Sequence, residues 1–465
     1  MSADAHMPRP PSSHGIDDNR DSGESGVKGS PGAFGRAALT LYRGLGRLAE
    51  PVLGLVLDRR AKRGKESGER RGERLGIASA ARPDGPLIWI HAASIGETMS
   101  VLPLVSRFAE EGLGVLLTTG TVTSAEIAER RLTGGAIHQY VPIDTPGAVT
   151  RFLDHWRPDL AIFTESELWP TMLASLQRRG VKLILVNGRL SQRSARRWGF
   201  VPVAAHAVMS LVDLVLAQTM VDAERFRALG APHVAISGNL KFDVPPPPAD
   251  PVELEALRGA LAGRPVFLAA STHPGEEAVV LEAHALLRRQ LPGLLTMIAP
   301  RHPARGSEIQ SAAVAAGRMS ALRSQGVAID GATEIYVADT IGEMGLWYRL
   351  AGAAFLGGSI VPHGGQNPIE PAKLGVPILH GPDVSNFTDV YQALADAGSV
   401  REVADAASLA NGALRVLADG AAAERAVRGA RVCVERLTGA VERTLAALEP
   451  DLKALKARGH AADRA

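Results

Sequence analysis

The chain has 465 residues, of which 46% are hydrophobic and 22% charged, and its formal net charge is +2. This length predicts two domains rather than one. The small net charge and the 4% of aromatic residues argue against nucleic acid as a partner. The single cysteine, Cys433, excludes an intramolecular disulfide and a cysteine-based zinc site, and it fits a reducing compartment.

The N-terminal residues 1–33 are rich in proline, serine, glycine and aspartate and offer little to bury. We expect them to form a disordered tail. They also lack the apolar core of a secretory signal peptide.

The next segment, 34–57, carries apolar residues at helical spacing, and a dense basic run follows it. Arg43, Arg47 and Glu50 interrupt the apolar pattern, so a membrane-spanning helix is not expected. We predict that residues 34–75 form a basic amphipathic helix region that lies in the membrane interface beside anionic lipid. The alternative is a soluble helix that packs on the protein body and carries a solvated charge run.

From residue 86 onward, short runs of valine, isoleucine and leucine alternate with helical patterns. Nearly continuous apolar strands are typical of a parallel sheet that is covered on both faces. A second series of such strands starts after the proline-rich segment 242–251, which cannot continue a helix or a central strand. The strands are predicted at 86–92, 114–120, 159–165, 182–187, 213–218 and 233–238, and then at 265–271, 294–300, 334–339, 353–358 and 376–381.

This alternation predicts an α/β protein with two Rossmann-like, doubly wound domains. We expect the first domain at 76–245, the second at 246–450, and a tail at 451–465. The segment 421–452 is predicted to be helical throughout.

Three turns in the stretch 339–389 lie next to predicted strands, and all would open on one edge of a parallel sheet. Open α/β sheets bind anions or nucleotides at that edge. The glycine turns 357–359 and 364–365 precede a helix start that holds Pro368 and Glu370. Helix N-terminal N–H groups attract phosphate, and a glutamate beside them suits ribose hydroxyls. A glycine turn alone is more often only a turn, but together these features suggest a nucleotide-sugar site.

Three acidic residues and a lysine are candidates for catalysis in the first domain. Glu97 begins a helix after a strand, where capping alone would explain it, although that position also keeps a carboxylate ionised. Glu165 and Glu167 end a strand; they share a face if the chain stays extended and diverge if a helix has begun. Lys241 precedes the proline-rich segment and is either a solvated charge or a group that offsets a departing phosphate.

In the second domain, Arg301 ends a predicted strand and could grip a phosphate with two parallel hydrogen bonds. His302 beside it could act as an acid but is more often a scaffold residue. The glycine-bearing turn 271–277 is a further candidate without an assigned role. No D-x-D motif occurs in the chain, and we therefore expect no essential metal; no cofactor is expected either.

The motifs IWIHAASIGE, FTESELWP, NGRLSQRS, GNLKFD, STHPGEE and APRHPAR follow one another in this order. Together with the stretch 339–389, they resemble the bacterial 3-deoxy-D-manno-octulosonic acid (Kdo) transferases over roughly residues 70 to 450. The resemblance implies a GT-B fold, in which an acceptor-binding and a donor-binding domain face each other across a cleft and C-terminal helices cross back to the first domain. It also implies inverting transfer of Kdo from CMP-Kdo to a lipid A precursor, lipid IVA, at the cytoplasmic face of the inner membrane.

The resemblance also assigns roles to single residues. It implies that Glu97 is the catalytic base, that Glu165 stabilises the transition state, and that Lys241 offsets negative charge. Gln366 stands where the family usually has histidine. Two other functions remain open: a nucleotide-sugar epimerase of the same fold, and a non-catalytic, membrane-associated nucleotide-binding protein. The implied contacts to the CMP part are Pro300, Arg301, Ile341, Gly342, Glu343, Asn367, Pro368, Ile369 and Glu370.

Overall fold

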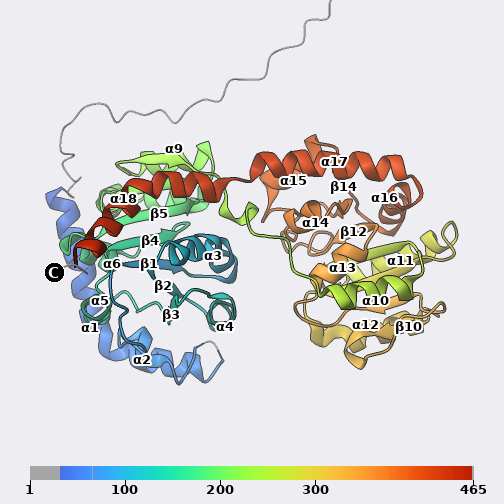
Figure 1. The fold of residues 1–465 in the computed structure, drawn as a ribbon, viewed down its shortest axis with the longest axis horizontal. Coiled ribbons are helices and arrows are strands. Elements are labelled where there is room, and N and C mark those ends of the chain that lie inside the picture. Colours follow the sequence, from blue (N-terminus) through green and yellow to red (C-terminus); the bar gives the residue numbers. More distant parts are fainter. Residues whose placement is uncertain (1–31, 65, 463–465) are drawn as a thin grey trace, which may run out of the picture. The chain divides into compact units, whose positions relative to one another are not determined.

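Two parallel β-sheets organise the chain in the computed structural model, which describes residues 32–64 and 66–462 (Figure 1). The predicted tail 1–33 therefore lies almost wholly outside the described residues. The chain divides into two compact units. Unit 1 comprises Met1–Val244 and Gly439–Ala465, and unit 2 comprises Pro245–Thr438.

The described part of unit 1 contains a seven-stranded sheet with the order β3-β2-β1-β4-β5-β6-β7, and each neighbouring pair is parallel. Its first strand, β1, is third in this order, so the chain adds strands first on one side of β1 and then on the other. The strands are β1 (Leu87–Ala92), β2 (Gly114–Thr119), β3 (Ile137–Tyr140), β4 (Leu160–Thr164), β5 (Lys182–Gly188), β6 (Leu214–Ala217) and β7 (Val234–Ile236).

Helices cover both faces of this sheet, as the apolar strands require. The helices of unit 1 are α1 (Ala33–Ala61), α2 (Arg71–Arg74), α3 (Ile95–Glu110), α4 (Val122–Arg131), α5 (Pro146–Trp156), α6 (Pro170–Arg178), α7 (Gln192–Gly199), α8 (Pro202–Met209), α9 (Met220–Ala228) and α18 (Ala440–Ala462), with a 3-10 turn at Leu240–Phe242. Alternate residues of β1 serve the two faces. Trp89 packs with Phe152 of α5, whereas Ile90 packs in the cluster that holds Leu104 of α3 and Leu448 of α18.

Unit 2 repeats this plan, again with parallel neighbours, in the order β10-β11-β9-β8-β12-β13-β14. Phe267 and Ala269 of β8 pack in a core with α11, α12 and α16. The strands are β8 (Val266–Thr272), β9 (Leu295–Pro300), β10 (Ser320–Leu322), β11 (Ile335–Val337), β12 (Ala353–Leu356), β13 (Ile378–His380) and β14 (Val400–Glu402). The helices are α10 (Pro251–Leu261), α11 (Glu276–Arg288), α12 (Gly306–Ala315), α13 (Met344–Leu350), α14 (Ile369–Lys373), α15 (Thr388–Asp396), α16 (Ala406–Ala418) and α17 (Gly420–Leu437).

The fold prediction of two Rossmann-like, doubly wound domains is confirmed, but three observed strands were not among the predicted ones. They are β3, β10 and β14, and each forms an outer edge of its sheet. An edge strand is covered less completely than a central one, so its sequence need not be a continuous apolar run. The sequence IHQY of β3 and the three-residue strands β10 and β14 show no such run.

The C-terminal segment differs from the prediction in two ways. It is not helical throughout, because α17 ends at Leu437 and Gly439, with φ of +87°, turns the chain before α18 begins. The side chain of Asp243 then accepts a hydrogen bond from the N–H of Gly439. Unit 2 therefore ends at Thr438 rather than at residue 450, and the chain crosses back to unit 1.

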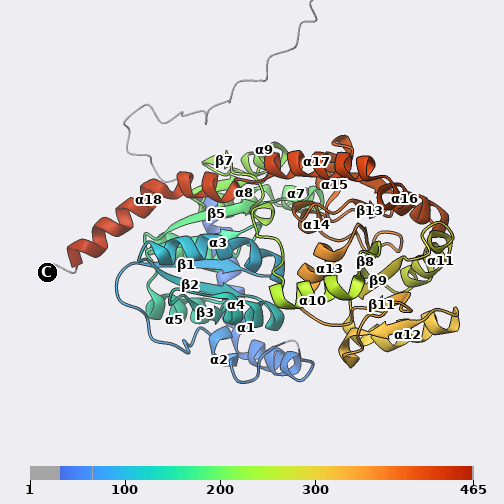
Figure 2. The ribbon, with the colours of Figure 1, turned by 45° about the vertical axis from the view of Figure 1, so that its right-hand side comes forward.

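The segment 451–465 was expected to be a tail, but α18 continues to Ala462. Figures 1 and 2 show this helix running over the sheet of unit 1. Leu452 and Leu455 are only 5% and 4% exposed and belong to the same core cluster as β1 and α3. Burial of these leucines holds the last turns of the chain on the sheet.

Helix α1 confirms the helical prediction for the segment after residue 33 and lies against α5, α6 and α8. Much of its apolar surface stays open: Leu41, Leu48 and Leu55 are 66%, 78% and 66% exposed. No helix in residues 32–64 and 66–462 is long and apolar enough to cross a bilayer.

Part of the basic run after α1 is bound within the protein. Arg71 pairs with Asp58 at 2.7 Å, and Arg74 pairs with Glu66 at 3.0 Å. These ion pairs leave fewer free cations for an anionic surface than the sequence suggested.

Candidate active site

Strands β1 and β4 are neighbours, although the chain runs through β2 and β3 between them. At such a switch point the two following loops diverge, and ligands bind at the carboxyl ends of the strands. Glu97 follows β1 and Glu165 follows β4, so the fold brings these two predicted residues to the same edge of the sheet.

The residue Glu97 is 7% exposed, and its carboxylate is held by three hydrogen bonds. Its Oε2 accepts from the N–H of Ala93 at 3.0 Å and from the hydroxyl of Thr164 at 2.6 Å. Its Oε1 accepts from the hydroxyl of Ser94 at 2.7 Å, while the Ser94 side chain caps the N–H of Glu97. Glu97 is thus part of the start of α3, as the capping alternative predicted. Two carboxylate oxygens offer about four acceptor positions, so capacity for a further proton donor remains.

Glu165 and Lys241 form an ion pair with 2.6 Å between Oε1 and Nζ. Glu165 has a φ of +51°, an uncommon conformation for a residue with a side chain. Lys241 stands in the 3-10 turn Leu240–Phe242, and a Cβ placed on Gly96 would lie 3.6 Å from its Cε. Lys241 therefore lies beside the start of α3, and the predicted residues Glu97, Glu165 and Lys241 are gathered at one place in unit 1.

Glu167 takes a different direction from Glu165, because a turn at residues 165–166 breaks the extended chain. Its Oε2 accepts from the indole N–H of Trp169 at 2.7 Å and lies 3.6 Å from Nε2 of His91. Burial raises the pKa of Glu167, but the nearby His91 ring and the hydrogen bond from Trp169 outweigh it, so this pKa lies below its ordinary value.

His91 was not among the predicted site residues. It is fully buried in β1, its Nδ1 lies 3.1 Å from the carbonyl oxygen of Thr118, and its Nε2 has no hydrogen-bond partner within the described chain. The sequence feature that could have pointed to His91 is that it is a single histidine near the end of an otherwise apolar strand.

The predicted donor residues of unit 2 stand at the carboxyl edge of its sheet. Arg301 follows β9, and Ile341–Glu343 follow the neighbouring strand β11. Arg301 is exposed, and its guanidinium makes no ion pair with the described residues. Ile341 is 84% exposed, and Gly342 beside it has open space around it and a φ of +90°. This corner offers one free cation and one apolar side chain to a ligand.

Glu343 is less available than the sequence suggested. Arg323 donates to both of its carboxylate oxygens, at 3.1 and 2.7 Å. Burial raises the pKa of Glu343, but the hydrogen bonds from Arg323 and Thr340 and the charge of Arg323 lower it below its usual range. The Glu343 carboxylate is therefore committed to Arg323.

The four residues Asn367–Glu370 form the start of α14. The Asn367 side chain caps this helix by accepting from the N–H of Ile369 at 3.0 Å. Glu370 is half-buried, and burial raises its pKa despite the opposing charge of Lys373. Pro300, Pro368 and Ile369 are buried, so they can present backbone but not side chains to a ligand.

The glycine turn at 357–359 does not offer free N–H groups to an anion. The buried carboxylate of Glu276, 0% exposed, occupies it. Its Oε2 accepts from the N–H of Gly358 at 2.7 Å and of His273 at 2.9 Å, and its Oε1 accepts from the N–H groups of Ser359, Ile360 and Val361 at 3.0, 3.1 and 3.4 Å. The N–H of Gly364 in the second turn is likewise bonded, to Asp383 at 2.8 Å. The expectation that these turns bind an anion is corrected, because internal carboxylates already fill them.

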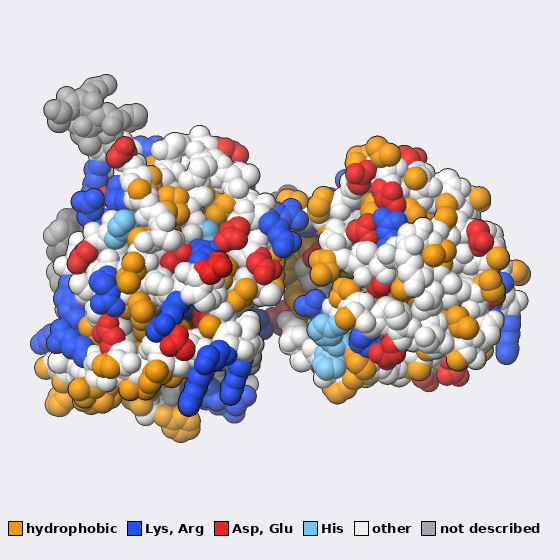
Figure 3. Space-filling model, turned by 90° about the horizontal axis from the view of Figure 1, so that it is seen from below, with side chains coloured by type: hydrophobic (Ala, Val, Ile, Leu, Met, Phe, Trp, Pro, Cys, Tyr) orange, Lys and Arg blue, Asp and Glu red, His pale blue; other side chains and the backbone are white. Residues whose placement is uncertain are grey.

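Three histidines gather near Arg301, and Figure 3 shows histidine side chains clustered at the surface of unit 2. The rings of His273 and His363 stack with centroids 4.2 Å apart, and the ring of His302 stands edge-on to His273 at 6.2 Å. Burial lowers the pKa of His273, and the charges of His363, His302 and Arg301 lower it further, against Glu276. His273 lies in the candidate turn 271–277, to which no role was assigned. His363 was missed because nothing in the sequence places the loops after β8 and β12 side by side.

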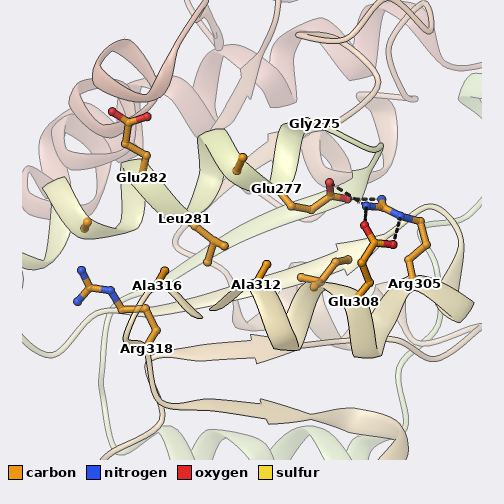
Figure 4. Close-up of a pocket in the computed structure, with 12 residues that line it drawn as sticks. Gly275, Glu277, Leu281, Glu282, Arg305, Glu308, Ala312, Ala316 and Arg318 are labelled. Carbon is orange, nitrogen blue, oxygen red and sulfur yellow. Dashed lines mark hydrogen bonds and ion pairs between the residues drawn. The ribbon is translucent and has the colours of Figure 1, made fainter. Parts of the chain in front are cut away.

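A hollow of about 590 Å³ lies elsewhere in unit 2, between α11 and α12 (Figure 4). Two arginines line it. Arg305 is bound by Glu277 at 2.6 Å and by Glu308 at 3.0 Å, and Arg318 is bound by Glu334 at 3.3 Å. Because both arginines are already paired with carboxylates, the hollow is a poor site for a phosphate.

The sequence motifs and the geometry agree with comparisons to known proteins. A model of the family described as "3-Deoxy-D-manno-octulosonic-acid transferase (kdotransferase)" matches residues 69–244. The chain is 38% identical to a 3-deoxy-D-manno-octulosonic acid transferase of Bordetella pertussis, covering 90% of this chain and 99% of that protein. It is 31% identical to the transferase of Haemophilus influenzae, over 89% and 98% of the two chains.

A solved structure of a putative UDP-N-acetylglucosamine 2-epimerase from Listeria monocytogenes has a TM-score of 0.55. It covers 80% of this chain and 97% of its own, at 14% identity, and therefore shares the fold alone. The sequence relatives, which span almost the whole length of both chains, decide the family. The chain belongs to the 3-deoxy-D-manno-octulosonic acid transferases, a family of glycosyltransferases.

Proposed function

We propose that this protein moves Kdo from CMP-Kdo to a lipid A precursor, lipid IVA, by one inverting displacement at the cytoplasmic face of the inner membrane. The observation that carries the proposal is the group of Glu97, Glu165 and Lys241 at the β1/β4 switch point of a chain that belongs to the Kdo transferases. The acceptor would bind unit 1, and unit 2 would hold the donor.

In this mechanism Glu97 accepts the proton of the attacking acceptor hydroxyl. Its carboxylate is fixed by Ala93, Ser94 and Thr164, so it keeps its orientation, and its remaining acceptor capacity is available to the incoming hydroxyl. The oxygen of that hydroxyl forms the new bond to the anomeric carbon as the bond to the phosphate oxygen breaks. The leaving group is CMP.

Charge develops on the departing phosphate and on the sugar during this step. Lys241 supplies a positive charge beside Glu97, and Glu165 holds its ammonium group at 2.6 Å. Arg301 supplies a second cation, which can bind a phosphate with two parallel hydrogen bonds. We propose these residues, with the exposed Ile341–Gly342 corner and the start of α14, as the machinery of transfer, and we propose that no metal is essential.

Release of CMP separates this function from its two alternatives. A Kdo transferase should release CMP from CMP-Kdo only when the lipid acceptor is present. An epimerase would convert the sugar without the lipid, and a non-catalytic nucleotide-binding protein would release no CMP under either condition. The measurement is CMP formation with and without acceptor, and release that does not depend on acceptor would overturn the proposal.

Arg301→Ala should weaken CMP binding and leave the fold intact. A hydrogen bond to a charged group is worth about 1.5–3 kcal/mol, which corresponds to about a 10- to 150-fold loss of affinity in calorimetry. Arg258→Ala is the matched control, because Arg258 is an exposed arginine of α10 that pairs only at the surface with Glu255. Equal CMP affinities of the two variants would remove Arg301 from the donor site.

We also propose that α1 contacts an anionic membrane surface. The proposal rests on the exposed leucines 41, 48 and 55, together with the exposed basic residues Arg59, Lys62 and Arg63 at the end of the helix. Leucines that protrude from a helix beside basic residues suit the boundary between lipid headgroups and acyl chains.

Replacing Leu41, Leu48 and Leu55 by serine should reduce binding to anionic vesicles without changing Tm. Insertion of one leucine contributes roughly 1.5–3 kcal/mol, so the triple variant should bind at least about 100-fold more weakly in a vesicle sedimentation assay. Serine at Val252, Val314 and Met319 is the control, because these exposed apolar residues all lie in unit 2. If the α1 variant binds vesicles as the wild type does, the helix serves only to pack on unit 1.

A further inference from the structure

A pocket of about 690 Å³ lies in unit 1 between α1 and the carboxyl edge of the sheet. This volume is in the range of small-molecule sites. One wall is α1, and the opposite wall comes from the segment after β3 and from the start of α6, with Val141, Ile143 and Met172. Most of the lining is apolar, and no residue assigned above to the donor site contributes to it.

The wall from α1 is a helical stripe of Tyr42, Leu45, Ala49, Leu53 and Val56. Spacings of three and four place these residues on one face of the helix. The exposed residues Leu41, Leu48 and Leu55 do not line the pocket, but they stand on the adjacent face of the same helix. The apolar surface is therefore continuous from the outside of α1 to the inside of the pocket.

The inner end of the pocket reaches the catalytic group. His91, Ala93 and Glu167 line it there. The N–H of Ala93 donates to Oε2 of Glu97, so the pocket ends one hydrogen bond away from the proposed base. An amphiphile whose chain fills the pocket would present its head close to Glu97.

The surroundings of the pocket include a group of cations. Arg43 of α1 is partly buried, and its Nε has no hydrogen-bond partner among the described residues. Burial lowers its pKa, and the charges of Arg178 and Arg47 lower it further, against the attraction of Asp144, which lines the pocket. Arg60 and Arg74 line the pocket itself, and both pair with Glu66, which also lines it.

We propose that this pocket binds a fatty acyl chain of an anionic glycolipid, which under the proposed function is the acceptor. The apolar lining and its continuity with the outer face of α1 match a fatty acyl chain. The pocket then selects acceptors by the length of their acyl chains. Each methylene that enters it should strengthen binding about fourfold, so affinity should rise with chain length until the pocket is filled.

Binding can be measured without activity, because Trp169 lines the pocket and is 40% exposed. Bromododecyl phosphate should quench its fluorescence, and Trp169→Phe should remove the quenched signal. Ala49→Phe narrows the pocket, so the probe concentration needed for half-maximal quenching should rise at least tenfold. Thr40→Phe is the matched control, because Thr40 is an exposed residue of α1 outside the pocket. Quenching that is equal in the Ala49 and Thr40 variants would overturn the proposal.

Val56→Phe, at the other end of the α1 wall, provides a second variant if Ala49→Phe lowers Tm. Transfer assays then separate this proposal from the function on which it rests. Ala49→Phe should raise KM for the acylated acceptor at least tenfold and leave transfer to the deacylated disaccharide unchanged. If the rate of Kdo transfer depends neither on the acyl length of the acceptor nor on the pocket variants, the proposed acyl pocket is refuted, but the proposed transferase function still stands. If the bromolipid quenches the Trp169 fluorescence but the protein transfers no Kdo, the proposed transferase function is refuted and the proposed acyl pocket still stands.

Discussion

Replacing Glu97 by glutamine is expected to lower the turnover of Kdo transfer by about 10²- to 10⁴-fold, the usual contribution of general-base catalysis. The amide keeps the size of the side chain and one acceptor oxygen, so Ala93 and Thr164 retain a partner. It cannot take a proton from the acceptor hydroxyl. The loss should therefore appear in kcat, and CMP-Kdo should bind as before.

Two control variants distinguish the role of Glu97 as a general base from a role as a helix cap. Ser94→Ala removes the cap of α3 and should cost roughly 0.5–2 kcal/mol of stability, with a much smaller effect on turnover than Glu97→Gln. Glu165→Gln should impair transfer without shifting the pH dependence that belongs to the base, because it only releases Lys241. If Glu97→Gln instead loses donor binding and thermal stability together, Glu97 is a cap. If it keeps full turnover, Glu165 or Glu167 becomes the candidate base.

The second large effect is structural and concerns Glu276. Glu276→Ala leaves five N–H groups without their acceptor, at His273 and at residues 358–361. A buried donor that loses its partner costs about 1–3 kcal/mol. Water that enters the space recovers part of this cost, so we expect unit 2 to lose about 3 kcal/mol or more in denaturant unfolding.

Glu282→Ala is the matched control for this experiment. Glu282 lies on the same helix, α11, but is exposed, so its removal should change stability by less than about 0.5 kcal/mol. The Glu276 variant should also weaken CMP binding, because the turn that it supports stands beside the His273–His363 stack. Equal stability of the two variants would show that Glu276 does not hold the turn.

The sequence predicted the central strands well, because a strand buried on both faces needs an unbroken apolar run. The six residues of β1 are all buried, and this run is visible without a structure. The edge strands β3, β10 and β14 lack such a run, and the end of unit 2 depends on one glycine turn at Gly439. Neither feature leaves a periodic signal along the chain.

The same division holds for the site. Glu165 and Arg301 follow apolar strands, where the strand order of a doubly wound sheet places ligands, and Glu97 begins the helix after another such strand. The resemblance to the Kdo transferases, rather than position alone, implied the role of Glu97. The partner of each side chain could not be predicted. Insertion of Glu276 into the turn after β12 joins residues about eighty positions apart. The ion pair of Glu343 with Arg323 joins loops at the ends of different strands.

The most direct test of the central claim is mass analysis of the lipid after incubation of the full-length protein with CMP-Kdo and lipid IVA. We predict that the lipid gains the mass of Kdo, that CMP appears in an amount equal to the Kdo gained, and that Glu97→Gln forms little of either product. An unmodified lipid, accompanied by free Kdo or by an interconverted sugar nucleotide, would contradict the account.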